Sequence, residues 1–131
     1  MTRDSMKDFA RACLRLAEEY LEDAKLALEH SRLRTAINCA YYAMFHAAQA
    51  VLAFREITPP RTHKGLREVF GREIILKGLA DKEFGKTLSR AFELRQASSY
   101  EVYASFGEEL VREIVERAED FVEKMKELIT E

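Results

Sequence analysis

Helix-breaking residues are scarce in this chain and absent from its first 58 positions. The two prolines are adjacent, at positions 59 and 60, and all five glycines follow them. Because glycine and proline interrupt helices more strongly than other residues, this distribution predicts long helices. The composition, 47% apolar and 34% charged, is globular, and no stretch alternates like a strand. We therefore expect one all-α domain over residues 1–131, an up-and-down bundle of four to five helices.

Two long helices are expected before the prolines. The first is predicted over about residues 5–30, with Ser5 as its N-terminal cap. Its apolar stripe is Phe9, Cys13, Leu16, Ala17, Tyr20, Ala24 and Leu28. The second is predicted over about residues 31–55, because a single helix reaching Arg55 would be unusually long for a compact domain. This second helix is rich in alanine and apolar on more than one face, which is typical of the centre of a bundle or of a subunit interface.

Three further helices are expected after the prolines. Thr62 is a candidate cap for the third helix, and Asp81 is a candidate cap for the fourth. We expect the serines at 98–99 to interrupt the fourth helix. Ser105 and Glu108 have the spacing of a capping box at the start of a final helix. The apolar stripe of that helix is Leu110, Ile114, Ala118, Phe121, Met125 and Leu128.

Arg95 is the residue of the fourth helix that most needs an explanation. It follows Ala91 by four positions and Leu88 by seven, so it lies on the apolar face of its helix. A half-buried arginine is costly unless a carboxylate pairs with it or a cleft solvates it. One interpretation is a salt bridge to a carboxylate such as Glu93 or Glu101. The other is a guanidinium that holds a phosphate, and the spacing alone favours neither.

Two tyrosines, Tyr100 and Tyr103, follow Arg95 closely. A tyrosine at such a place can stack on a base or donate its hydroxyl to a phosphate. Spacing alone favours ordinary packing with an outward hydroxyl. Their closeness to Arg95 makes them candidate site residues.

One broad face of the second helix is polar and aromatic, although the helix is otherwise apolar. Its members are Asn38, Tyr42, Phe45, His46 and Gln49. This face either lines a cleft shared with Arg95 or forms a polar network at a helix–helix contact, and the second is slightly favoured. A single histidine such as His46 is more often a hydrogen-bonded core residue than a general base.

A short basic cluster surrounds His63, between Arg61 and Lys64. At the start of a helix such a cluster can receive a phosphate. An ordinary solvated loop explains the same residues, so His63 is a candidate binding residue and no more.

Composition excludes several classes of function. The net charge of −2 argues against strong binding of duplex nucleic acid, although a local basic cleft remains compatible with it. Cys13 and Cys39 form no C-x-x-C pair, so we expect reduced thiols in a cytoplasmic protein without a zinc site. No signal peptide or membrane span is recognisable. Phosphate-binding glycine loops, nucleophile elbows and H-E-x-x-H motifs are also missing, so conventional hydrolase or kinase chemistry is disfavoured. No metal or cofactor is expected.

Several segments together resemble the HEPN family. Residues 36–46, Ala-Ile-Asn-Cys-Ala-Tyr-Tyr-Ala-Met-Phe-His, are similar to the central-helix signature of HEPN domains, and residues 17–24 are similar to the family's first helix. Residues 62–65 and 70–71 are similar to its mid-chain helix. Residues 92–100 are similar to the stretch that carries the family's arginine. The order and spacing hold over nearly the whole chain, and the small stand-alone prokaryotic members are the most similar.

The resemblance implies a bundle that forms a homodimer through its central helices, often beside a minimal nucleotidyltransferase in a toxin–antitoxin module. It also implies metal-independent ribonuclease chemistry, in which the ribose 2′-OH attacks the adjacent phosphate. In active members an arginine and a histidine meet their symmetry mates at the dimer seam. Arg95 fills the arginine position, but Tyr100 stands where active members have histidine. Since a tyrosine with its ordinary pKa of about 10 is a poor general base, either the activity is weak or lost, or another group such as His46 substitutes.

Two functions are therefore expected as alternatives. The first is a HEPN-type RNA- or nucleotide-binding protein, with or without ribonuclease toxin activity, that acts with a nucleotidyltransferase antitoxin. Its site would be Arg95 and Tyr100 as catalytic residues, with Asn38, Tyr42, His46, His63 and Tyr103 as binding residues. The second is a catalytically inactive helical dimerisation module. A metal enzyme built in the bundle core is disfavoured because the long helices lack a Glu-x-x-His pair.

Overall fold

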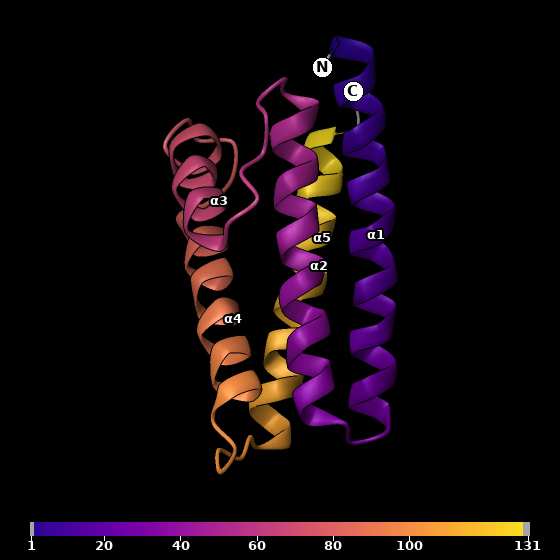
Figure 1. Cartoon of the computed structure of the whole chain (residues 1–131), viewed down its shortest axis with the longest axis vertical. Helices are drawn as coiled ribbons and strands as arrows, with labels where there is room; N and C mark the ends of the chain where they lie inside the picture. The colour runs from indigo at the N-terminus through magenta and orange to yellow at the C-terminus, as the bar shows by residue number, and fades with distance from the viewer. Residues whose placement is uncertain (1, 130–131) are drawn as a thin grey trace.

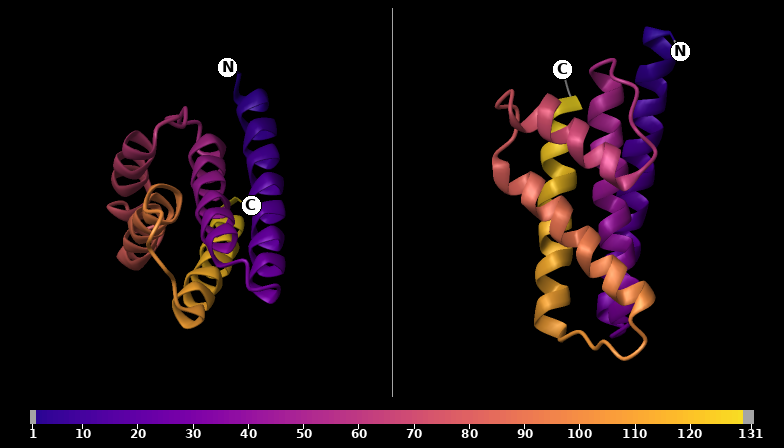
Figure 2. Two further views of the ribbon diagram at one scale, coloured as in Figure 1. Left: turned by 60° about the horizontal axis from the view of Figure 1, so that its bottom comes forward. Right: turned by 60° about the vertical axis from the view of Figure 1, so that its left-hand side comes forward.

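The structure, a computed structural model, describes residues 2–129 as an up-and-down bundle of helices (Figures 1 and 2). The elements are α1 (Arg3–Glu29), α2 (Leu33–Phe54), α3 (His63–Phe70), the short π-helix η1 (Gly71–Ile75), α4 (Lys82–Tyr100) and α5 (Glu108–Ile129). No strand occurs among these residues, which confirms the all-α prediction. Across residues 2–129, no helix combines the length and the apolar character needed to cross a membrane.

The central helix of the bundle is α2. Twelve of its residues are buried, and α1, α4 and α5 all pack against it. Seven of the twelve are alanines, whose small side chains let neighbouring helices approach closely. In Figure 1, α5 lies behind α2 while α1 and α4 flank it, so no helix of residues 2–129 lies in front of α2.

The uncovered side of the bundle is formed by α1 and α2 together. Its partly or largely exposed aromatic and apolar side chains are Phe9, Leu16, Tyr20, Tyr42, Phe45 and His46, and we call this surface the open face. Two of them, Phe9 and Leu16, belong to the predicted apolar stripe of the first helix but are 38% and 37% exposed. Towards the core α1 turns the alanines at 10, 17 and 24, and each of them is fully buried.

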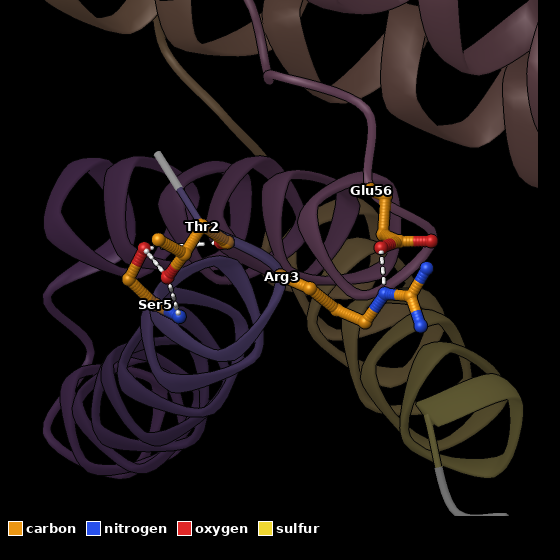
Figure 3. Close-up of polar contacts among 4 residues, drawn as sticks. All are labelled: Thr2, Arg3, Ser5 and Glu56. Carbon is orange, nitrogen blue, oxygen red and sulfur yellow. Dashed lines mark hydrogen bonds and ion pairs between the residues drawn. The ribbon is translucent and has the colours of Figure 1, made fainter.

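The chain starts with a capped helix that is tied to the end of α2. Thr2 is the N-cap of α1, and its Oγ1 accepts a hydrogen bond from the N–H of Ser5 at 3.1 Å (Figure 3). The prediction that Ser5 caps this helix is therefore wrong, because Ser5 lies within the first turn. Beside it, Arg3 Nε forms an ion pair of 2.6 Å with Glu56 Oε1, just after α2.

The caps predicted for α3 and α4 are confirmed. The side chain of Thr62 accepts a hydrogen bond from the N–H of Gly65 at 3.0 Å. That of Asp81 accepts one from the N–H of Glu83 at 2.9 Å. These two caps fix where the helices that carry His63 and Arg95 begin.

The end of α4 and the start of α5 differ from prediction. α4 runs unbroken to Tyr100, so the expected interruption at residues 98–99 is wrong. The hydroxyl of the buried Ser98 donates to the carbonyl oxygen of Arg95 at 3.0 Å, a bond that a serine can make inside a helix. α5 begins at Glu108, so Glu108 is a first-turn residue and Ser105 lies too far upstream to form the predicted capping box.

Candidate functional site

Arg95 extends from α4 towards α2 and lies against two tyrosine rings. Its Nη2 donates to the hydroxyl of Tyr42 at 2.9 Å, and its Cζ lies 5.4 Å from the ring centroid of Tyr42 and 6.0 Å from that of Tyr41. The Nε atom is buried without a hydrogen-bond partner. Within the described chain no carboxylate lies within ion-pair distance, so neither Glu93 nor Glu101 pairs with it. A cation held only by a phenol and aromatic faces remains able to bind an anion.

His63, at the start of α3, joins the same cluster. Its Nδ1 lies 2.9 Å from the Tyr41 hydroxyl, and its ring stacks on Phe92 of α4 with centroids 3.4 Å apart and planes at 7°. Its Nε2 is buried and unpartnered. Burial, together with the positive charges of Arg67 and Arg95, lowers the pKa of His63 to about 4. This ring is therefore neutral near pH 7.

Tyr41 lies between His63 and Arg95 and contacts both. It is 2% exposed, and burial raises the pKa of its hydroxyl well above the ordinary value, although the charge of Arg95 opposes the rise. The hydroxyl therefore stays protonated and available for hydrogen bonding to His63. Neither Tyr41 nor Phe92 carries a signal in the sequence, because a site aromatic residue at helical spacing cannot be distinguished from an ordinary core residue.

The polar face predicted on α2 is divided between two neighbours. Asn38 and Tyr42 contact α4, where Ser99 Oγ donates to Asn38 Oδ1 at 3.5 Å. His46 and Gln49 instead face α1: His46 Nδ1 lies 2.9 Å from Gln49 Oε1, and the His46 ring stacks on Tyr20 with centroids 5.6 Å apart. Each pair therefore makes polar contacts with a neighbouring helix, as the second interpretation of this face expects.

His46 is a second neutral histidine. Burial lowers its pKa, while the hydrogen bond to Gln49 acts in the opposite direction. The same Gln49 oxygen accepts a weak bond of 4.0 Å from the thiol of Cys13. Cys13 is buried, Cys39 is half-buried, and both are free thiols. Burial raises the pKa of Cys13 to about 11, so this thiol is unreactive.

The two candidate tyrosines beyond Arg95 lie in solvent. Tyr100, the last residue of α4, is 72% exposed, and Tyr103 in the following loop is 100% exposed. The structure thus brings Arg95, Tyr42 and His63 into one cluster, with Asn38 beside it. Tyr100 and Tyr103 lie outside this cluster and are exposed to solvent. In residues 2–129 no group of His, Cys, Asp or Glu side chains is arranged to hold a metal ion.

The fold and the cluster define a small helical-bundle protein with an unpaired arginine beside an uncovered central helix. Comparison with known families gives this class a name. The model of the HEPN domain matches residues 10–128, and the chain belongs to the HEPN family.

Relatives of similar length support this assignment. A protein of Thermotoga maritima named UPF0332 protein is 37% identical over 115 residues, covering 88% of this chain and 86% of its own. A UPF0332 protein of Archaeoglobus fulgidus is 37% identical over 116 residues, covering 88% of this chain and 91% of its own. A protein of Methanocaldococcus jannaschii carrying the name "Putative toxin" is 30% identical over 126 residues, covering 96% of this chain and 92% of its own.

Proposed function

We propose that this chain is an RNA-binding HEPN protein in which Arg95 holds a phosphate of the bound strand. The observation that carries this proposal is the Arg95 guanidinium, which Tyr42 holds at 2.9 Å and which has no carboxylate partner in the described chain. A planar guanidinium donates two parallel hydrogen bonds to phosphate oxygens. Asn38 lies next to it and supplies a further polar group for the same strand, and His63 lies beside Arg95 in the same cluster.

The protein acts as a homodimer whose two open faces lie against each other. The support is the exposure of Phe9 and Leu16, because a contiguous apolar and aromatic surface is unfavourable in water. Tyr42 belongs both to the open face and to the contact with Arg95. Two copies joined through this face therefore bring their arginines to one shared groove.

Ribonuclease activity is the second element of the proposal. The ribose 2′-OH loses its proton and attacks the adjacent phosphorus, the bond to the 5′ oxygen breaks, and that oxygen takes up a proton. Arg95 stabilises the negative charge on the phosphoryl oxygens. The groups proposed for the proton transfers are Tyr100, which is exposed, and His46, whose lowered pKa leaves it able to accept a proton near pH 7.

The proposed partner is a minimal nucleotidyltransferase, and the proposed role is that of a toxin component that this partner restrains. The support is membership of the HEPN family and the toxin name of the Methanocaldococcus jannaschii relative. The alternative is a catalytically inactive dimerisation module. It is favoured by Tyr100, which occupies the position where active members of the family have histidine.

Binding and cleavage of a labelled single-stranded RNA test the proposal. The variants are Arg95→Ala and, as a matched control, Arg90→Ala, which removes an exposed arginine of the same helix. We expect Arg95→Ala to bind about 10-fold more weakly or worse, because hydrogen bonds to charged groups contribute about 1.5–3 kcal/mol. Equal binding and cleavage by wild type and Arg95→Ala would remove Arg95 from any active role. A dimer that binds no RNA but co-purifies with a nucleotidyltransferase would support the alternative.

A further inference from the structure

The last residue of α4 and the loop that follows it present apolar side chains to solvent. Tyr100, Val102 and Tyr103 are 72%, 83% and 100% exposed, and we call residues 100–103 the tip. They are among the most exposed large hydrophobic residues of the described chain. Because these exposed side chains bury little apolar surface, they contribute little to the stability of the fold and are available to bind a partner.

The backbone of the tip is nevertheless firmly held, by Arg34 at the start of α2. The guanidinium of Arg34 donates to a set of carbonyl oxygens from the last turn of α4 and the following loop. They are those of Ser98, Glu101 at 3.1 Å, Val102 at 3.3 Å, and Ala104. Its Cζ also lies 5.4 Å from the ring centroid of Phe106. One side chain therefore holds one carbonyl of the last turn of α4, that of Ser98, and three carbonyls of the following loop.

This arrangement aligns the tip with Arg95. Arg34, Asn38 and Tyr42 follow one another at intervals of four residues along α2, so they share one face. Along that face Arg34 contacts the tip, Asn38 contacts Ser99, and Tyr42 contacts Arg95. The seam between α2 and α4 thus fixes the tip and the proposed phosphate-binding group relative to each other.

We propose that the tip is a base-stacking platform for unpaired nucleobases of single-stranded RNA, and that Arg34 is the positioning residue that preassembles it. The proposal rests on the proposed function, because the stacked bases belong to the strand whose phosphate Arg95 holds. Two exposed tyrosine rings offer flat surfaces to any base. A single strand fits better than a duplex, because the chain has a net charge of −2 and duplex binding needs a broad basic face.

The stacking is tested with two fluorescently labelled strands of equal length, an oligouridylate and the same strand with abasic riboses. Wild-type protein is expected to bind the base-bearing strand more tightly in anisotropy titrations. Tyr100→Leu and Tyr103→Leu should each weaken binding of that strand about 5-fold or more, and leave the abasic strand unaffected. The matched control is Leu76→Ala, which alters an apolar residue 82% exposed on another part of the surface and should change neither titration.

The role of Arg34 is tested by Arg34→Lys, which keeps the positive charge but replaces the planar guanidinium and its several N–H donors by a single ammonium group. The control is Arg32→Lys, a neighbouring exposed arginine. Arg34→Lys should lose the preference for bases, and adding it to a variant with both Tyr100→Leu and Tyr103→Leu should cost no further affinity, because all three changes act through the tip. A change that only loosens the fold would add its effect to that of the double tyrosine variant and weaken binding of the abasic strand equally.

The outcomes separate this proposal from the proposed function. If binding depends on Arg95 but the tyrosine variants retain the base preference, the platform is overturned and the proposed function stands. If wild-type protein binds neither strand, both are overturned. If the tyrosine variants change only the mass of the assembly and not RNA binding, the tip is a protein contact and the platform is again overturned.

Discussion

Arg95 on α4 donates through Nη2 to the hydroxyl oxygen of Tyr42 on α2, at 2.9 Å. These residues are 53 positions apart in the chain. The tyrosine oxygen directs the guanidinium without neutralising it, which a carboxylate in the same place would do. The contact therefore both orders a half-buried cation and preserves its charge for a ligand.

Replacing Tyr42 by Phe is expected to destabilise the fold modestly and to weaken RNA binding less than Arg95→Ala does. The variant keeps the ring under the guanidinium and removes only the hydrogen-bond acceptor, at a cost of about 1–2 kcal/mol. Urea unfolding measures the loss. Tyr20→Phe is the control, because Tyr20 contributes its ring to stacking with His46 and Tyr42. Equal destabilisation by both variants would mean that the Arg95 hydrogen bond is not the cause.

Stability is expected to fall in weak acid because of His63. Its pKa is about 4 in the folded protein and near 6.5 without the fold. Between these values the unfolded chain binds more protons, so the free energy of unfolding decreases as pH is lowered from 6.5 towards 4. We expect a loss on the order of 1–2 kcal/mol, reduced from the full shift because the ring is partly exposed.

Urea unfolding at several pH values between 6.5 and 4.5 measures this effect. His63→Gln should flatten the dependence, since glutamine keeps a polar group beside Tyr41 and does not titrate. The exposed His30 provides the control variant, His30→Gln, which should leave the slope unchanged. An identical slope in wild type and His63→Gln would show that His63 is not the titrating group.

Most of the helical architecture could be predicted because its signals are local. The caps Thr62 and Asp81 act on residues two or three positions away, so the sequence alone reveals them. The turn between α1 and α2 gives no such signal. It is made by Ser31 at φ 56°, a left-handed conformation usually left to glycine, so its position could be inferred only from helix length.

The candidate site was only partly predictable because its contacts join distant segments. The spacing of Arg95 indicates that it lies on an apolar face. Whether its guanidinium donates to a phenol or pairs with a carboxylate depends on how α4 packs on α2. Arg34 carried no signal at all, since its partners are backbone carbonyls 64 to 70 positions away. In α1, spacing predicts the apolar stripe but not the rotation of the helix, so it does not distinguish the exposed Phe9 and Leu16 from the buried members of that stripe.

Gly65→Ala is expected to destabilise α3 and to disturb His63. A Cβ at this position would lie 2.9 Å from Pro60 Cβ and 2.9 Å from Thr62 Oγ1, the atom that caps the helix. Displacing both should cost about 1–3 kcal/mol in thermal or urea unfolding. Gly71→Ala is the matched control, because a Cβ there meets nothing within 4 Å and the residue already has helical angles. We expect that variant to be neutral or slightly more stable, and a loss equal to that of Gly65→Ala would refute the steric explanation.

Leu16→Glu is expected to dissociate the proposed homodimer while leaving the bundle folded. Leu16 is 37% exposed on the open face, so a carboxylate is tolerated in the monomer but must lose its water when two open faces meet. Sedimentation should show a monomer at concentrations where wild type is dimeric, with unchanged circular dichroism. Leu26→Glu is the control, because Leu26 is 51% exposed on the same helix but lies about 80° around its axis from Leu16.

The same pair of variants connects assembly to function. If a shared groove is formed by two copies of Arg95, the monomeric Leu16→Glu protein should bind RNA more weakly and lose any cleavage, although its own Arg95 is intact. Leu26→Glu should behave as wild type in both assays. A monomeric Leu16→Glu protein with full RNA affinity would place the whole site within one chain, because the contact between Arg95 and Tyr42 would then suffice without a second copy.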